Sequence, residues 1–107
     1  MKVDTITREE FEGMTTHKIT ATYTDENTGL QAQLQGYFFR ESEDGEERFR
    51  MLVPPRLLKL FFPKEAEQGL WGVFDVIYPE AKGPTPGYTR IKEASFAYFA
   101  RVERRKA

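Results

Sequence analysis

The sequence contains no cysteine and a single histidine, which excludes several kinds of active site. Without cysteine there is no disulfide, no thiol nucleophile and no thiolate ligand for a metal ion. His17 alone cannot form a histidine metal site, and no carboxylate stands at ligand spacing beside it. We therefore expect no metal and no cofactor. The lack of cysteine fits a reducing compartment, so a cytoplasmic protein is expected.

The chain also lacks a long apolar run and a strong net charge. Its longest apolar stretch, residues 57–62, contains Lys59 and is far shorter than the roughly 20 residues that a membrane-spanning helix needs. Residues 1–5 have no apolar segment behind their positive charge, unlike a secretory signal. The formal net charge of −1 gives no overall attraction to nucleic acid or anionic lipid. We expect no membrane contact, and nucleic-acid binding would need a local basic patch.

What the chain does contain is the composition of a folded protein. Its 107 residues are the size of one domain, and 14% of them are aromatic. Disordered chains are poor in aromatic residues, so this share argues for a packed core. We predict a single β-rich domain over residues 1–107, with a short basic tail at 104–107.

A short helix is predicted near the N-terminus. Thr7 and Glu10 have the spacing of a capping box, in which each side chain bonds the backbone N–H of the other residue. Ile6 and Phe11 flank this cap as a hydrophobic staple. Gly13 is placed to end the helix in a left-handed conformation, after little more than one turn.

Residues 17–24 alternate between apolar and polar side chains, which predicts a strand with one solvent-facing side. Its inner face would consist of His17, Ile19, Ala21 and Tyr23. A four-residue loop that ends at Gly29 would then pair Tyr23 with Ala32.

Residues 30–53 predict a β-hairpin whose register can be counted from its turn. Asp44-Gly45 favours a type I′ turn, because both residue types tolerate positive φ angles. Counting outwards pairs Phe39 with Arg50 and Tyr37 with Leu52, and a slip by one residue would destroy the match in character. The inner face would consist of Leu30, Ala32, Leu34, Phe38, Phe49, Met51 and Val53.

A helical region follows the hairpin. Pro54-Pro55 would stop the strand and start a helix over residues 56–62, since proline is favoured at the first helical position. Pro63 would break or kink that helix, and a further turn would close at Gly69.

The rest of the chain predicts two strands. Residues 70–78 are apolar on both faces, as in a central strand, and residues 79–87 have loop composition. Residues 88–103 alternate as a strand does, although their composition also permits a helix. We favour the strand, with a bulge near Lys92-Glu93 that brings Ile91 into phase with the residues after it.

The predicted order is a short helix and then β-β-β-α-β-β. This is a mainly β (α+β) fold: a small curled antiparallel sheet, or a five-stranded OB-like barrel with a helix between the third and fourth strands and a short N-terminal helix.

The outer face of the hairpin is the best candidate for a binding surface. Its residues are Gln31, Gln33, Gln35, Tyr37, Phe39, Arg48, Arg50 and Leu52. Aromatic and arginine side chains on a sheet can stack bases and hold phosphates. The same face can instead stabilise itself, through a cation–π pair of Phe39 with Arg50 and an ion pair of Glu41 with Arg48, or be covered by another element. It can also contact protein.

Two further features of the sequence bear on function. The helix over residues 56–62 has an apolar face too wide for one contact, so it either closes the end of the sheet or binds a partner. Asp75 lies among apolar neighbours and is expected to be partly buried.

The sequence holds no set of residues that would form a known type of catalytic site, so we predict a protein that is not an enzyme. The leading hypothesis is a non-catalytic binding or assembly module that contacts protein, which includes a second copy of itself. The alternative is an OB-like domain that binds single-stranded nucleic acid through the outer hairpin face.

Overall fold

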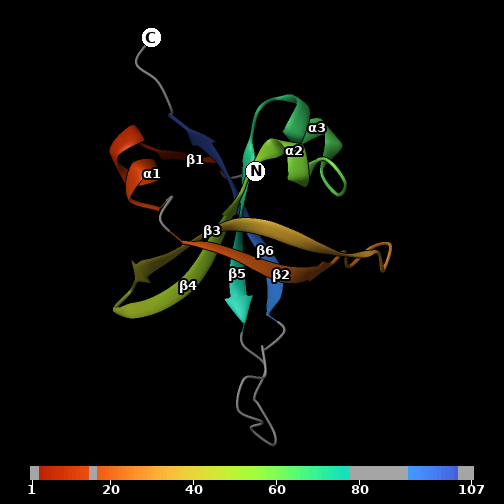
Figure 1. Ribbon diagram of the computed structural model, residues 1–107, viewed down its shortest axis with the longest axis horizontal. Coiled ribbons are helices and arrows are strands. Elements are labelled where there is room, and N and C mark those ends of the chain that lie inside the picture. Colours follow the sequence, from red (N-terminus) through yellow and green to blue (C-terminus); the bar gives the residue numbers. More distant parts are fainter. Residues whose placement is uncertain (1–2, 15–16, 78–91, 104–107) are drawn as a thin grey trace, which may run out of the picture.

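The computed structural model describes residues 3–14, 17–77 and 92–103, and it is mainly β (Figure 1). Its elements are β1 (Val3–Ile6), α1 (Arg8–Met14), β2 (Lys18–Thr24), β3 (Gln31–Glu43), β4 (Glu46–Val53), α2 (Pro55–Leu58), α3 (Pro63–Glu67), β5 (Trp71–Ile77) and β6 (Glu93–Val102). The predicted loop over residues 79–87, Ile91 and the basic tail at 104–107 lie outside the described residues.

The strands form one six-stranded mixed sheet whose hydrogen bonds close into a ring. From β2 to β6, each strand pairs with the next along the chain in antiparallel fashion, and β6 returns to pair with β2. The closing pair is parallel and short, because only Thr22–Glu93 and Tyr23–Ala94 are in register. β1 was not predicted, and it lies outside the ring, parallel to the end of β6. The sheet is therefore mixed rather than antiparallel throughout.

The predicted register of the hairpins is confirmed. Phe39 pairs with Arg50 and Tyr37 with Leu52, and the turn at Asp44-Gly45 has the expected positive φ angles of 51° and 80°. The preceding loop closes at Gly29, with φ of 74°, and pairs Tyr23 with Ala32. Turn chemistry and side-chain alternation were thus sufficient to fix three consecutive strands.

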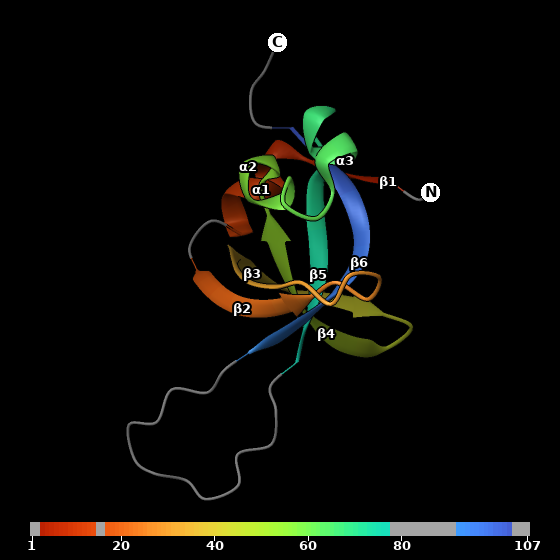
Figure 2. The ribbon, with the colours of Figure 1, turned by 90° about the vertical axis from the view of Figure 1, so that its right-hand side faces the viewer.

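The inner core lies within the ring and is closed at one end by α2 and α3 (Figure 2). Leu34, Met51, Val53 and Phe74 are buried there. Tyr23 packs against Phe61, which follows α2, with ring centroids 4.9 Å apart. Two residues that were predicted for this core are exposed, Leu30 at 56% and Phe49 at 39%: Leu30 precedes β3, and Phe49 lies in the half of β4 nearer the turn, where the strand is exposed. His17, also predicted to face inwards, is exposed and packs on Phe38.

The helical region is two short helices, in agreement with the predicted break at Pro63, but the first is shorter than the helix predicted over residues 56–62. Pro55 starts α2 as expected, but α2 ends at Leu58. Pro63 begins α3 at its first position, where a missing N–H costs nothing. Phe62, held out of helical geometry before that proline, separates the two helices. The predicted closure at Gly69 is confirmed by its φ of 79°.

A second hydrophobic cluster lies on the other side of the sheet, under α1. It contains Ile6, Phe11, Leu52, Trp71, Val73 and Ala100. The predicted capping box holds α1 in place: the Thr7 N–H donates to Glu10 at 2.9 Å, and the Glu10 N–H donates to Thr7 Oγ1 at 3.2 Å. Gly13 was expected to end the helix, which instead continues to Met14, because Met14 packs against this outer cluster. We call the two clusters the inner core and the outer cluster.

The last element is a strand, as favoured, and it has a bulge that was not predicted; the bulge predicted near Lys92-Glu93 concerns Ile91, which lies outside the described residues. Phe96 pairs with Phe74 and Tyr98 with Val73, so Ala97 is the extra residue. The bulge reverses the alternation of β6. Phe96 and Phe99 can therefore both pack against Phe62 on the inner side, at centroid distances of 4.8 and 5.3 Å.

Candidate binding surfaces

The outer hairpin face is not one continuous exposed surface. Gln33, Gln35 and Arg48 are exposed, and Tyr37 and Phe39 are half-buried. Leu52 and Arg50 are buried, with 0% and 4% of their surface exposed. The face therefore divides into a glutamine strip, an apolar part and an ionic part. Whether any of these residues binds a partner stays a prediction.

The apolar part of this face belongs to the outer cluster. The Phe11 ring from α1 meets Tyr37 edge-on at 5.9 Å and Trp71 at 5.3 Å. Leu52 is buried in the same cluster, and Phe39 packs against it. These side chains bury apolar surface within the chain itself, which leaves them little area to offer to a ligand.

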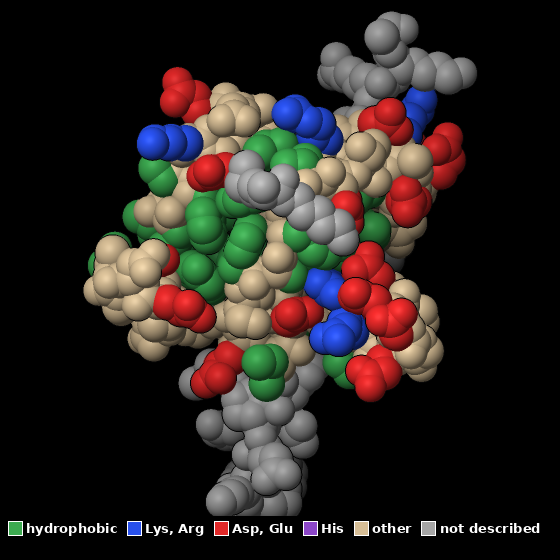
Figure 3. Space-filling view, turned by 180° about the vertical axis from the view of Figure 1, so that it is seen from behind, with side chains coloured by type: hydrophobic (Ala, Val, Ile, Leu, Met, Phe, Trp, Pro, Cys, Tyr) green, Lys and Arg blue, Asp and Glu red, His purple; other side chains and the backbone are tan. Residues whose placement is uncertain are grey.

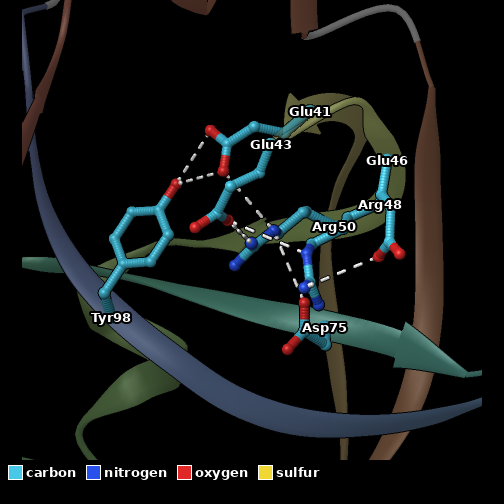
Figure 4. A network of polar contacts seen from close by, with 7 residues as sticks. All are labelled: Glu41, Glu43, Glu46, Arg48, Arg50, Asp75 and Tyr98. Atoms are coloured by element: carbon cyan, nitrogen blue, oxygen red, sulfur yellow. Dashed lines mark hydrogen bonds and ion pairs between the residues drawn. The ribbon is translucent and has the colours of Figure 1, made fainter.

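The ionic part is organised around Arg50 (Figure 4). The register of β4 and β5 places Arg50 opposite Asp75, and Arg50 Nε lies 3.4 Å from Asp75 Oδ1. The same Nε is 3.5 Å from Glu41 Oε1, and the other end of the guanidinium, Nη2, donates to Glu43 at 3.2 Å. A buried arginine requires such compensation, because an unpaired charge away from water is strongly unfavourable.

Tyr98 extends this network from β6. Its hydroxyl group donates to Glu41, with both carboxylate oxygens 3.1 Å away, and its ring lies 5.4 Å from the Arg50 guanidinium carbon. Burial, reinforced by the nearby Glu41 carboxylate, raises the pKa of Tyr98. The cation–π contact of Arg50 is thus made with Tyr98 from a different strand, a pairing that the hairpin sequence could not reveal.

Arg48 has different partners from those predicted. The sequence paired Arg48 with Glu41, which lies opposite in the register. Its guanidinium instead lies 3.7 Å from Glu43 and 4.0 Å from Glu46, the two acids that face each other near the turn. Arg48 thereby relieves their repulsion, and Glu41 is left for Arg50 and Tyr98.

A hollow of about 660 Å³ opens over the Arg50 network. Four of its lining residues are acidic (Asp4, Glu41, Glu43 and Asp75) and two are basic (Arg48 and Arg50). Most of these charges already pair with one another, and no group of three or more His, Cys, Asp or Glu among the described residues is arranged to hold a metal ion. Asp75 is half-buried, as expected, and its role here is to neutralise Arg50.

A larger hollow, of about 780 Å³, lies between the start of β3 and the two helices α2 and α3. It is lined by Ala32, Gln33, Leu34, Pro55, Arg56, Leu57, Lys59, Leu60, Pro63, Ala66 and Glu67. We call it the helix groove. Figure 2 views this side, where the two helices stand over β2 and β3. Leu60 is 62% exposed in the turn between the helices.

The helix groove is the site that sequence reasoning reached only in part. The wide apolar face of residues 56–62 was recognised, but it was not linked to β3. The link comes from Ala32 and Leu34, which were assigned to the core and also line the groove. Seen from behind the view of Figure 1, hydrophobic side chains form a broad area, and a group of acidic and basic side chains lies beside it (Figure 3).

Within the part of the chain that the structure describes, no helix is long and apolar enough to cross a membrane. Comparison with known proteins finds no match for this chain among family models, curated sequences or solved structures.

Proposed function

We propose that this protein is a non-catalytic binding or assembly module that contacts protein, which includes a second copy of itself, through the helix groove. The observation that carries the proposal is the exposed Leu60 beside a mostly apolar hollow. Leu60 keeps 62% of its surface exposed, although Leu58, two residues earlier, is fully buried. Complete burial of an exposed leucine side chain contributes about 1.5–3 kcal/mol of free energy. A partner that covers Leu60 therefore gains binding free energy from this contact.

The groove also has the make-up of a protein contact rather than of a catalytic pocket. Its polar residues, Gln33, Arg56, Lys59 and Glu67, lie among leucine, proline and alanine. Interfaces combine an apolar centre with a charged rim in the same way. Among the described residues that line the groove there is no histidine, and Glu67 is the one carboxylate, with no second acid with which to share acid–base work. We therefore propose that the protein is not an enzyme and works without a cofactor, and that it is cytoplasmic, which rests on its cysteine-free sequence.

The proposal is tested by selecting binders from an unbiased displayed peptide library against the full chain. We expect enriched peptides with apolar anchors, whose binding is lost in Leu60→Asp. Ile77→Asp is the matched control, because Ile77 is 51% exposed and does not line the groove. Failure to enrich any peptide, combined with a monomeric protein, would count against the groove as a protein contact.

The alternative remains an OB-like domain that binds single-stranded nucleic acid on the outer hairpin face. Gln33, Gln35 and Arg48 are exposed there and could contact a strand. The support is weaker, because Tyr37 and Phe39 are half-buried and Arg50 is neutralised by carboxylates. The strands of the ring also pair in chain order, whereas an OB barrel is a Greek key.

Fluorescence anisotropy with a labelled single-stranded oligonucleotide at low salt tests this alternative. We expect no binding tighter than about 10 µM, since phosphate contacts supply most of such affinity and this face is rich in acids. Salt-sensitive binding that is lost on Phe39→Ala would overturn the leading proposal.

A further inference from the structure

The helix groove has a feature that points to one occupant, and the inference from it rests on the function proposed above. The groove carries its own protruding apolar residue: Leu60 is both a lining residue and 62% exposed. In a two-fold symmetric dimer, the same surface of each copy forms the contact. Leu60 of one copy can therefore enter the helix groove of the other copy, and Leu60 of the second copy can enter the groove of the first. We propose that the groove is the contact between two copies of this chain.

The charges around the groove favour the same arrangement. Arg56 and Lys59 come from α2 and the turn that follows it, and Glu67 comes from α3. Within the described residues, neither Lys59 nor Glu67 has an ion-pair partner. A surface that carries both positive and negative side chains can pair each of them with an opposite charge when it contacts a second copy of itself. Lys59 of each protomer then faces Glu67 of the other, and the pair occurs twice.

The inner lining suits a leucine side chain. Ala32 and Ala66 are small residues on opposite walls, contributed by β3 and α3, and Leu57 and Pro63 are apolar. A hollow of about 780 Å³ has ample room for a side chain of this size. Two leucines are buried per dimer, so the apolar part of the contact counts twice for each single substitution.

The first experiment measures the dissociation constant of the full chain by sedimentation velocity over a series of concentrations. We expect a reversible monomer–dimer equilibrium, which Leu60→Asp weakens by roughly 100-fold, because two buried leucines are lost at about tenfold each. Ile77→Asp, the exposed control outside the groove, should leave the equilibrium unchanged. Circular dichroism checks that both variants stay folded, as expected for substitutions at exposed positions.

The second experiment tests the reciprocal ion pairs by mixing. Lys59→Glu alone and Glu67→Lys alone should each weaken the dimer by a fewfold, since like charges then meet in both contacts. An equimolar mixture of the two variants should restore association, because every contact between unlike protomers again joins a lysine to a glutamate. Only a contact between copies of this chain produces this rescue.

Each outcome has one consequence. A protein that stays monomeric at high concentration overturns the inference; the proposed function still stands if peptides then bind in a Leu60-dependent manner. A dimer that is indifferent to Leu60→Asp overturns the inference as well, because it places the contact elsewhere. A dimer that responds to Leu60→Asp without rescue in the mixture refutes the proposed pairing of Lys59 with Glu67.

Discussion

The start of β3 and the end of β4 are neighbours in the same sheet, but the outer face of the first is exposed and the outer face of the second is buried. At the start of β3, Gln31, Gln33 and Gln35 are exposed on the outer face. At the end of β4, Leu52 is buried on that face as completely as Met51 is on the inner one. The difference lies in what covers each part. α1 packs over the end of β4, and its residue Phe11 contacts Tyr37 and Trp71 there. Polarity along a strand thus records whether another element crosses it.

The largest expected effect follows directly from this comparison. Leu52→Ala should lower the free energy of unfolding by about 2–4 kcal/mol, as much as Met51→Ala, because both side chains are fully buried and each substitution leaves a cavity. Urea denaturation measures both. Gln35→Ala, at an exposed position on the same outer face, should change stability by less than about 0.5 kcal/mol. A Leu52→Ala variant as stable as Gln35→Ala would mean that α1 does not cover the end of β4.

The two arginines of β4 offer a second contrast. Arg50→Met should cost about 2–3 kcal/mol, since it leaves Glu41 and Asp75, each about a third exposed, without their buried partner. Arg48→Met should cost less than about 1 kcal/mol, because the side chain of Arg48 is 46% exposed and its ion pairs are screened by water. Equal losses in denaturation experiments would show that the Arg50 network is no better shielded than the hairpin tip.

The third effect concerns α1, the helix that covers the end of β4. Thr7→Ala removes one half of the capping box and should cost about 1 kcal/mol. Glu9→Ala, in the same helical turn but outside the capping box, is the control. Hydrogen exchange should show faster opening of α1 and of the amides near Leu52, while the inner core keeps its protection. A uniform increase across the sheet would show that the outer cluster does not open separately.

The other half of the capping box, the Glu10 carboxylate, gives the cap a pH dependence. The hydrogen bond from the Thr7 backbone N–H to the Glu10 carboxylate lowers the pKa of Glu10. A lowered pKa in the folded state means that the cap contributes its stability above the ordinary glutamate range and loses it as the pH falls through the lowered value. The stability difference between wild type and Glu10→Ala should therefore shrink in acid, because Glu10→Ala removes the carboxylate that accepts this bond.

Much of this architecture was accessible from local sequence rules. The hairpin from residue 30 to 53 was fixed by Asp44-Gly45 and by alternation, because turn type determines register. The capping box at Thr7 was equally local. What the sequence did not provide was β1, a strand of four residues that is stabilised by pairing with β6 far along the chain.

The partial coverage of the outer hairpin face could not be predicted from the hairpin sequence alone. Counting the hairpin register places Tyr37, Phe39, Arg50 and Leu52 on one face, but it does not show which of them another element covers. Their coverage depends on α1 and Tyr98, which come from opposite ends of the sequence. The bulge at Ala97 was not predicted for a related reason: it accompanies the packing of Phe96 and Phe99 on Phe62, which lies far away in the sequence.

The smallest expected effect is on the pKa of a single hydroxyl group, that of Tyr98. Glu41→Gln should lower the raised pKa of Tyr98 without returning it to the ordinary value, because burial is the larger cause and the carboxylate the smaller one. Ultraviolet absorbance during an alkaline titration, with Tyr98→Phe to identify the signal, measures this. A tyrosine whose pKa is raised by folding contributes stability that is complete below its ordinary pKa and is lost as the pH rises through the folded value. In Glu41→Gln that loss should be complete at a lower pH. An unchanged titration would mean that burial under the outer cluster alone governs Tyr98, and that Glu41 serves Arg50 only.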